Sequence, residues 1–147
     1  MLAITFHGES SNLRSRIYVN GVKKALHRVC GLVKCPPTAV VAVIFVRDQK
    51  MRELNRKYRG KDKATNVLAF PNQVSGFRFQ VSGVDLVDVF ISIPEARREA
   101  KKYGWTLNYE IARLAVHGFL HLLGYEHGKE KEARRMEQLE QKILYNF

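Results

Sequence analysis

Apolar and polar positions along the first part of the chain predict a strand, a helix and a second strand. Leu2 to Phe6 alternates loosely, as a strand does. Ala39 to Val46 is a continuous apolar run rich in β-branched residues, which is typical of a fully buried central strand. The segment between them, near Leu13 to Leu32, carries an apolar stripe at helical spacing, made by Val22, Leu26, Val29 and Val33.

The next segment predicts a helix and a short strand. Asp48 can cap the helix, and Gly60 ends it. Thr65 to Phe70 then reads as a strand that Pro71 stops, and such a strand often lies at the edge of a sheet.

The last part of the chain predicts one strand and three helices. The predicted elements are a loop at Asn72 to Gly83, a strand at Leu86 to Ile93, a helix from Pro94 to near Gly104, a helix that Thr106 or Asn108 begins, and a helix at Lys129 to Tyr145. The whole order favours an α+β fold in one domain spanning residues 1–147, with a small mixed four-stranded sheet packed by about five helices.

Composition adds a strong positive charge to this picture. The formal net charge is +11 for 147 residues, which favours anionic partners such as nucleic acid or an acidic membrane surface. Apolar runs are too short to span a membrane, and the N-terminal segment lacks the pattern of a signal peptide. Cys30 and Cys35 are too few for a disulfide scaffold, so we expect reduced thiols and a cytoplasmic protein, with a bridge between the two or a metal-binding role as the alternative.

Three of the five histidines, His117, His121 and His127, have the spacing H-x-x-x-H-x-x-G-x-x-H. Apolar residues before them have helical spacing, so His117 and His121 lie about 40° apart around one helix and about 6 Å apart along it. Both imidazoles can then reach one ion at roughly 2.0–2.1 Å. Gly124 can adopt a left-handed conformation that ends the helix, which lets His127 return as a third ligand.

Three neutral imidazoles suit one zinc ion per chain and leave a coordination position open, as in a catalytic site. A purely structural site, with Glu126 or a distant residue as the fourth ligand, is the alternative. The spacing matches that of metzincin proteases except at Gly118, where those enzymes have the glutamate that takes a proton from the metal-bound water. Ordinary zinc-protease chemistry therefore lacks its base in this chain.

The segment from Val116 to His127 resembles the signature of the YbeY family, bacterial metal-dependent endoribonucleases that act in ribosomal RNA maturation. Further blocks agree with it at Leu54 to Asp62, Thr65 to Pro71 and Asp88 to Ser92, and the resemblance covers most of the chain from Ala39 onward. It implies a zincin-like fold. It also implies a zinc-dependent endoribonuclease that cleaves single-stranded RNA in maturation of the 16S 3′ end and in ribosome quality control, with the small ribosomal subunit as a partner.

The resemblance also singles out Arg59, which matches an arginine associated with activity in the family. We expect Arg59 and the metal ligand His117 to be the catalytic residues, because the guanidinium fork suits a phosphoryl group. Arg59 lies in a run of cations in which Arg56, Lys57 and Lys61 are candidate RNA-binding residues. A solvated helix face is the simpler interpretation of such a run.

Asp88 interrupts an apolar strand, where a carboxylate is costly unless it is hydrogen-bonded or paired. A structural partner and a hydrogen bond that supports a metal-bound histidine are both open explanations, and Glu126 is a second candidate for such support. Asn66 stands where the family commonly has aspartate, which puts a base role there in doubt. Thr65 and Asn66 either position a substrate or turn the chain.

Two other functions remain open at this point. One is a metallopeptidase with a relocated base, against which Gly118 counts. The other is a non-catalytic ribosome-assembly factor that binds RNA and uses the metal for stability, and the net charge suits it equally well. We expect no membrane association and no small-molecule cofactor, and the sequence predicts no particular oligomeric state.

Overall fold

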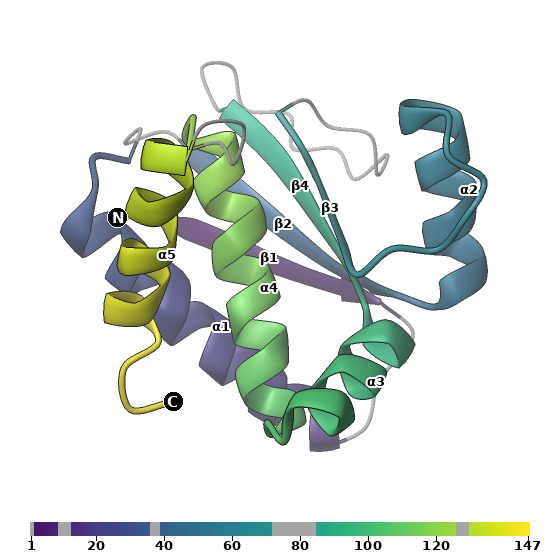
Figure 1. Ribbon diagram of the computed structural model, residues 1–147, viewed down its shortest axis with the longest axis horizontal. Helices are drawn as coiled ribbons and strands as arrows, with labels where there is room; N and C mark the ends of the chain where they lie inside the picture. Colours follow the sequence, from purple (N-terminus) through teal and green to yellow (C-terminus); the bar gives the residue numbers. More distant parts are fainter. Residues whose placement is uncertain (1, 9–12, 36–38, 72–84, 126–129) are drawn as a thin grey trace.

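The structure is a computed structural model that describes residues 2–8, 13–35, 39–71, 85–125 and 130–147. The described residues form four strands and five helices (Figure 1), which confirms the predicted α+β class. Their bounds are β1 (Ala3–Gly8), α1 (Leu13–Leu32), β2 (Ala39–Val46), α2 (Asp48–Arg59), β3 (Val67–Phe70), β4 (Asp85–Ser92), α3 (Ile93–Tyr103), α4 (Leu107–Leu122) and α5 (Glu130–Ile143).

The sheet is mixed and has the strand order β1-β2-β4-β3. β1 and β4 both run parallel to β2, and β3 pairs antiparallel with β4. β2 is therefore central, as its apolar run predicts, and the short β3 lies at an edge, next to Pro71. The predicted loop from Asn72 to Gly83 falls outside the described residues.

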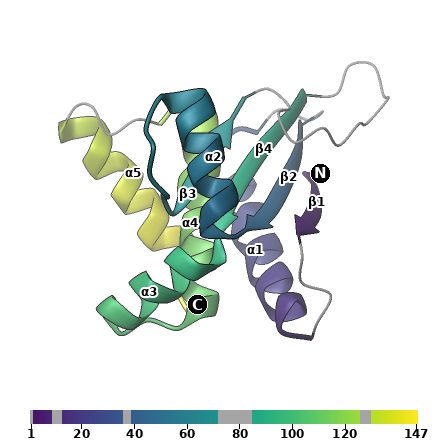
Figure 2. The same ribbon diagram turned by 90° about the vertical axis from the view of Figure 1, so that its right-hand side faces the viewer.

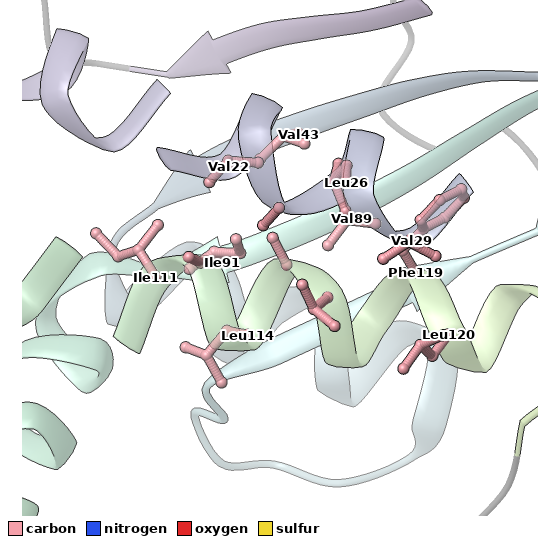
Figure 3. Packing of buried hydrophobic residues seen from close by; sticks show 14 of the residues in the cluster. Val22, Leu26, Val29, Val43, Val89, Ile91, Ile111, Leu114, Phe119 and Leu120 are labelled. Carbon is pink, nitrogen blue, oxygen red and sulfur yellow. The ribbon is translucent and has the colours of Figure 1, made fainter. Parts of the chain in front are cut away.

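Helices cover both faces of the sheet, because the side chains of the central strand β2 are apolar on both sides. Val43, Val89 and Ile91 point to the face covered by α1, α4 and α5, which carries the larger core (Figure 3). Ile44 and Phe90 point to the opposite face, which is covered by α2. Figure 1 shows α4 passing in front of β1, with α5 to its left and α2 on the right-hand side of the molecule, and Figure 2 views the molecule from the α2 side.

Local sequence sets most of the helix ends. Ser92 caps α3 by accepting a hydrogen bond from the Glu95 backbone N–H, and Thr106 caps α4 in the same way. Gly60 and Gly104 follow α2 and α3 with φ of 69° and 71°, in the left-handed region that glycine tolerates best.

The predicted cap of α2 is wrong. Arg47 occupies the N-cap position, and Asp48 is the first helical residue. The Asp48 carboxylate instead accepts hydrogen bonds from the Ser92 hydroxyl at 3.1 Å and from the Arg98 guanidinium at 2.8 Å. Partners distant in sequence, at the end of β4 and on α3, therefore occupy the carboxylate that would otherwise have capped α2.

The prediction of reduced thiols is also wrong in this structure, since Cys30 and Cys35 form a disulfide. α1 ends at Leu32, and the chain after it brings the two Cα atoms to 5.4 Å, within the range that a disulfide requires. Within the described ranges, no helix is long and apolar enough to cross a membrane.

Candidate metal centre

Between positions 109 and 121, α4 is buried except along one line of residues. From position 109 to position 121, the residues that are not buried are Tyr109, Arg113, His117 and His121. They are spaced four apart, so they follow one another along a single line on the helix surface. We call these four residues the accessible ridge. The predicted metal-binding histidines are therefore its two C-terminal members.

The two histidines of the ridge face each other. His117 Nε2 lies 3.2 Å from His121 Nε2. Two nitrogens that bind one tetrahedral zinc ion at roughly 2.0–2.1 Å lie about 3.3–3.4 Å apart. The pair thus fits two of the three predicted ligands.

The third predicted ligand, His127, and the neighbouring Glu126 lie outside the described residues. Gly124, which precedes them, has a φ of 99°, as the predicted left-handed turn requires. Among the residues that the structure describes, no three histidine, cysteine or acidic side chains group together as a metal site. The ligand set therefore depends on the segment that follows Gly124.

A carboxylate that the sequence did not single out supports His117. Glu140 Oε1, on α5, lies 2.8 Å from His117 Nδ1. An ionised carboxylate only accepts hydrogen bonds, so Nδ1 carries the proton and Nε2 keeps its lone pair for a ligand. Sequence analysis missed Glu140 because it is 23 residues from His117 and lies in a helix with mixed charges.

Asp88, expected as a possible support, lies elsewhere. It alternates in β4 with Val89, which faces α4, and shares the side of Phe90, which faces α2. Burial lowers the pKa of His7 on β1, and the nearby charge of Asp88 opposes that shift. Asp88 thus belongs to the α2 face, and Glu140 is the carboxylate placed against His117.

Gly118 lies where α4 packs closest to the sheet. A Cβ atom at this position would come within 3.1 Å of Val89 Cγ1 and 3.2 Å of Val67 Cγ2. A longer side chain would meet the sheet rather than the histidines, which point away from it along the ridge. The glutamate of a metzincin protease therefore has no place here.

Arg113, one turn before His117 on the ridge, belongs to a half-buried polar network. Its Nε donates to Glu110 Oε1 at 2.7 Å, and its guanidinium lies 3.7 Å from Glu99. Burial raises the pKa of the Glu110 carboxyl, and Arg113 offsets part of that rise. Glu99 Oε1 also accepts a hydrogen bond from the Asn66 side chain at 3.0 Å.

This network gives Asn66 a structural task. Its side-chain oxygen accepts a hydrogen bond from the Val67 backbone N–H at 2.8 Å, and its backbone oxygen accepts one from Ser92 N–H at 2.9 Å. Asn66 therefore holds the start of β3 against α3. Of the two explanations left open by the sequence, the structure favours turning the chain.

The predicted RNA-binding cations lie at the end of α2 and just after it. Arg56, Lys57, Arg59 and Lys61 are all exposed. α2 and α4 cover opposite faces of the sheet, so the structure does not bring Arg59 directly against the two histidines. Any approach of its side chain to them runs around the edge strand β3.

Comparisons with known proteins agree with the fold and with the family that the histidine segment resembles. A family profile described as Endoribonuclease YbeY matches residues 3–147. A protein named Endoribonuclease YbeY from Geobacillus kaustophilus is 41% identical over 134 residues, which cover 88% of this chain and 86% of that protein. A protein of the same name from Bacillus thuringiensis is 36% identical over 151 residues, which cover 99% and 96%.

The fold has a counterpart among solved structures. The solution structure of TM1509 from Thermotoga maritima matches with a TM-score of 0.63 and 27% identity, over 96% of this chain and 86% of that one. The profile match over nearly the whole sequence and these full-length relatives place the chain in the family that its histidine segment resembles: it is a member of the YbeY family of endoribonucleases.

Proposed function

We propose that this protein is a zinc-dependent endoribonuclease that cleaves single-stranded RNA, with ribosomal RNA, including the 3′ end of 16S, as its substrate. The observation that carries the proposal is the His117–His121 pair, whose Nε2 atoms lie 3.2 Å apart on the accessible ridge. Membership of a family named for endoribonuclease activity supplies the reaction class. A cytoplasmic location and a partner in the small ribosomal subunit belong to the same proposal.

The metal ligands in this proposal are His117, His121 and His127, with one zinc ion per chain. A bound zinc ion supplies Lewis-acid assistance to cleavage of the phosphodiester bond. Glu140 holds the His117 ring with its Nε2 lone pair directed toward His121. Both rings are part-buried, so their positions are restricted before RNA arrives.

Arg59 is the candidate for stabilising charge on the phosphoryl group, because a guanidinium can donate two parallel hydrogen bonds to phosphate oxygens. It closes α2 just before the Gly60 turn, where a long side chain can leave the helix face. Arg56, Lys57 and Lys61 are candidates for holding the RNA backbone. Single-stranded RNA fits better than a duplex, because its unpaired bases can contact side chains along the ridge.

The competing functions make different predictions. A metallopeptidase needs a base near the histidines, and packing of Gly118 against Val67 and Val89 excludes one at that position. A binding-only assembly factor would bind RNA without cutting it.

The test is cleavage of an end-labelled, unstructured RNA by purified protein, with a chelator and with zinc restored. We expect cleavage to stop in the chelator, to return with zinc and to be absent in His121→Ala. His27→Ala is the matched control, because His27 is an exposed histidine on α1. RNA that is bound but uncut under every condition would indicate the assembly factor, and hydrolysis of an unfolded protein without RNA cleavage would indicate the peptidase.

A further inference from the structure

Two exposed aromatic rings stack at the junction between α3 and α4. Tyr103 ends α3 and Trp105 follows the Gly104 turn, and their ring centroids lie 4.9 Å apart with an interplanar angle of 28°. Tyr103 is 54% exposed and Trp105 is 38% exposed. Large aromatic side chains that remain this accessible are characteristic of binding surfaces. We call this pair the aromatic platform.

Contacts with α3 and α4 hold the Trp105 ring of the aromatic platform in place. The Trp105 ring meets the Tyr109 ring edge-on at 5.3 Å, and the Arg113 guanidinium lies 5.3 Å from the Trp105 ring centroid. The Trp105 backbone N–H also donates to Ala100 O at 2.9 Å. Such support lowers the entropy lost when a ligand binds, because the rings are already ordered.

The platform continues the accessible ridge. Trp105, Tyr109, Arg113, His117 and His121 are spaced four residues apart, and the Trp105 ring contacts both Tyr109 and Arg113. Trp105 lies at the end of α4 that Figure 1 shows next to α3. The ten helical steps of α4 from Leu107 to His117 rise about 15 Å, so an extended strand of a few nucleotides can reach from the platform to His117.

Cations surround the platform. Lys101 and Lys102 are exposed in the last turn of α3, and Lys102 Nζ lies 5.3 Å from the Tyr103 ring centroid. Stacked rings beside flexible cations suit a single strand, in which bases stack on the rings and phosphates meet the ammonium groups. A purely apolar partner would leave these charges without a counterpart.

We propose that Tyr103 and Trp105 form a nucleobase-stacking site for single-stranded RNA, a few nucleotides from the bond that is cut. This inference rests on the proposed function, and it adds the direction in which the strand lies: along the accessible ridge, from the histidines toward the start of α4. Stacking does not select a particular base, because every base has a flat face.

The chain contains a single tryptophan, so its intrinsic fluorescence reports on this site alone. The experiment mixes the zinc-loaded protein with end-labelled, unstructured RNA in a stopped-flow instrument. Tryptophan emission and RNA anisotropy are followed before cleavage, and cleavage is measured in the same samples later. Inorganic polyphosphate, which has charge but no bases, replaces RNA in a parallel titration.

We expect RNA to quench the tryptophan emission and polyphosphate to leave it nearly unchanged. Tyr103→Ala should bind RNA roughly 5- to 100-fold more weakly, the range expected for losing one stacked base. Tyr145→Ala is the matched control, because Tyr145 is 72% exposed and lies beyond α5, so it should bind as the unaltered protein does. In a series of RNAs that each carry one abasic nucleotide at a different position, the quenching should be lost only when that nucleotide lies at one particular distance from the cleaved bond.

Two results would overturn the inference, and they separate it from the proposed function. If RNA is bound and cut while tryptophan emission and the affinity of Tyr103→Ala stay unchanged, the platform is not a stacking site and the enzyme proposal stands. If RNA is neither bound nor cut, both proposals fail together.

Discussion

Glu140 fixes which nitrogen of His117 is available to a metal. Its carboxylate lies 2.8 Å from Nδ1, so removing it frees the ring to rotate and to change tautomer. We expect Glu140→Ala to bind zinc about 10- to 100-fold more weakly, as measured by competition with a chromogenic chelator. Glu140→Gln should lose less, because its amide oxygen can still accept the Nδ1 proton.

Glu137 supplies the control for this prediction. It is an exposed glutamate one turn earlier on α5, and Glu137→Ala should bind zinc as the unaltered protein does. Equal zinc affinity in Glu140→Ala and Glu137→Ala would mean that the hydrogen bond to His117 does not support the site.

Arg59 tests whether the protein stabilises a transition state or only holds RNA. A guanidinium directed at charge that develops during cleavage should affect kcat more than affinity. We expect Arg59→Ala to keep its metal, to bind RNA nearly as well, and to lose on the order of 10²–10³-fold in single-turnover cleavage at saturating enzyme. Arg59→Lys should rescue little, because lysine keeps the charge and loses the fork.

The binding titration on the same RNA is the control for the Arg59 prediction. Unchanged cleavage at saturation, together with weaker binding, would make Arg59 a binding residue. That outcome is of particular interest because α2 lies across the sheet from α4.

At the scale of the helix, α4 combines a core function with the candidate site. Residues 110–112, 114–116 and 118–120 are buried, and Gly118 lets the helix approach β3 and β4 closely. Gly118→Ala should therefore gain less stability than its helix propensity offers, because the added Cβ presses on Val67 and Val89.

Gly31 is the matched position for this comparison, since it lies in α1 and a Cβ there would have no neighbour within 4 Å. Gly31→Ala should stabilise the fold by up to about 1 kcal/mol, and Gly118→Ala should fall short of it by about 1 kcal/mol or more, in urea unfolding. Equal gains at the two positions would show that the sheet yields easily to a methyl group.

At the scale of the whole molecule, the net charge of +11 predicts strongly salt-dependent RNA binding. Replacing Arg56 and Lys57 with glutamine should weaken binding. It should also lower the slope of log K against log salt by about 1.4, or 0.7 for each lost contact to a single strand. The double variant Lys23→Gln and Lys24→Gln, two exposed neighbours on α1, should leave the slope almost unchanged. A lower slope for the Lys23 and Lys24 variant, with an unchanged slope for the Arg56 and Lys57 variant, would indicate that RNA binds on the α1 side.

The stability of the fold should also depend on the protonation of Glu110. Burial raises its pKa in the folded state, so the folded protein holds this proton at a pH where the unfolded chain has released it. The stability that the neutral form contributes is present below the unfolded pKa and is lost as the pH rises through the raised folded value. We expect the unfolding free energy of Glu110→Gln, relative to that of the unaltered protein, to increase as the pH rises through that range.

Glu130→Gln is the control for the pH prediction, because Glu130 is an exposed glutamate on α5. The difference in unfolding free energy between Glu130→Gln and the unaltered protein should be the same at every pH. A constant difference between Glu110→Gln and the unaltered protein would mean that the pKa of Glu110 is the same in both states.

Features that depend on neighbours along the chain were predictable from the sequence alone. The helical period places His117 and His121 on one line, and the apolar run of β2 and the proline after β3 place those strands at the centre and at the edge. The Thr106 cap, one of the two starts predicted for α4, follows the same rule, because its hydrogen bond reaches only three residues along the chain.

Features that depend on how elements pack were decided only by the tertiary structure. Glu140 meets His117 because α5 docks beside α4, and Asp88 faces away from the histidines because α2 and α4 cover opposite faces of the sheet. The accessible ridge exists because neighbouring elements bury the other sides of α4 between positions 109 and 121, and the aromatic platform exists because the turn at Gly104 brings the Tyr103 and Trp105 rings together. Spacing along a sequence specifies the face of a helix or strand on which a residue lies, whereas the partner of that face is set by packing between segments far apart in the chain.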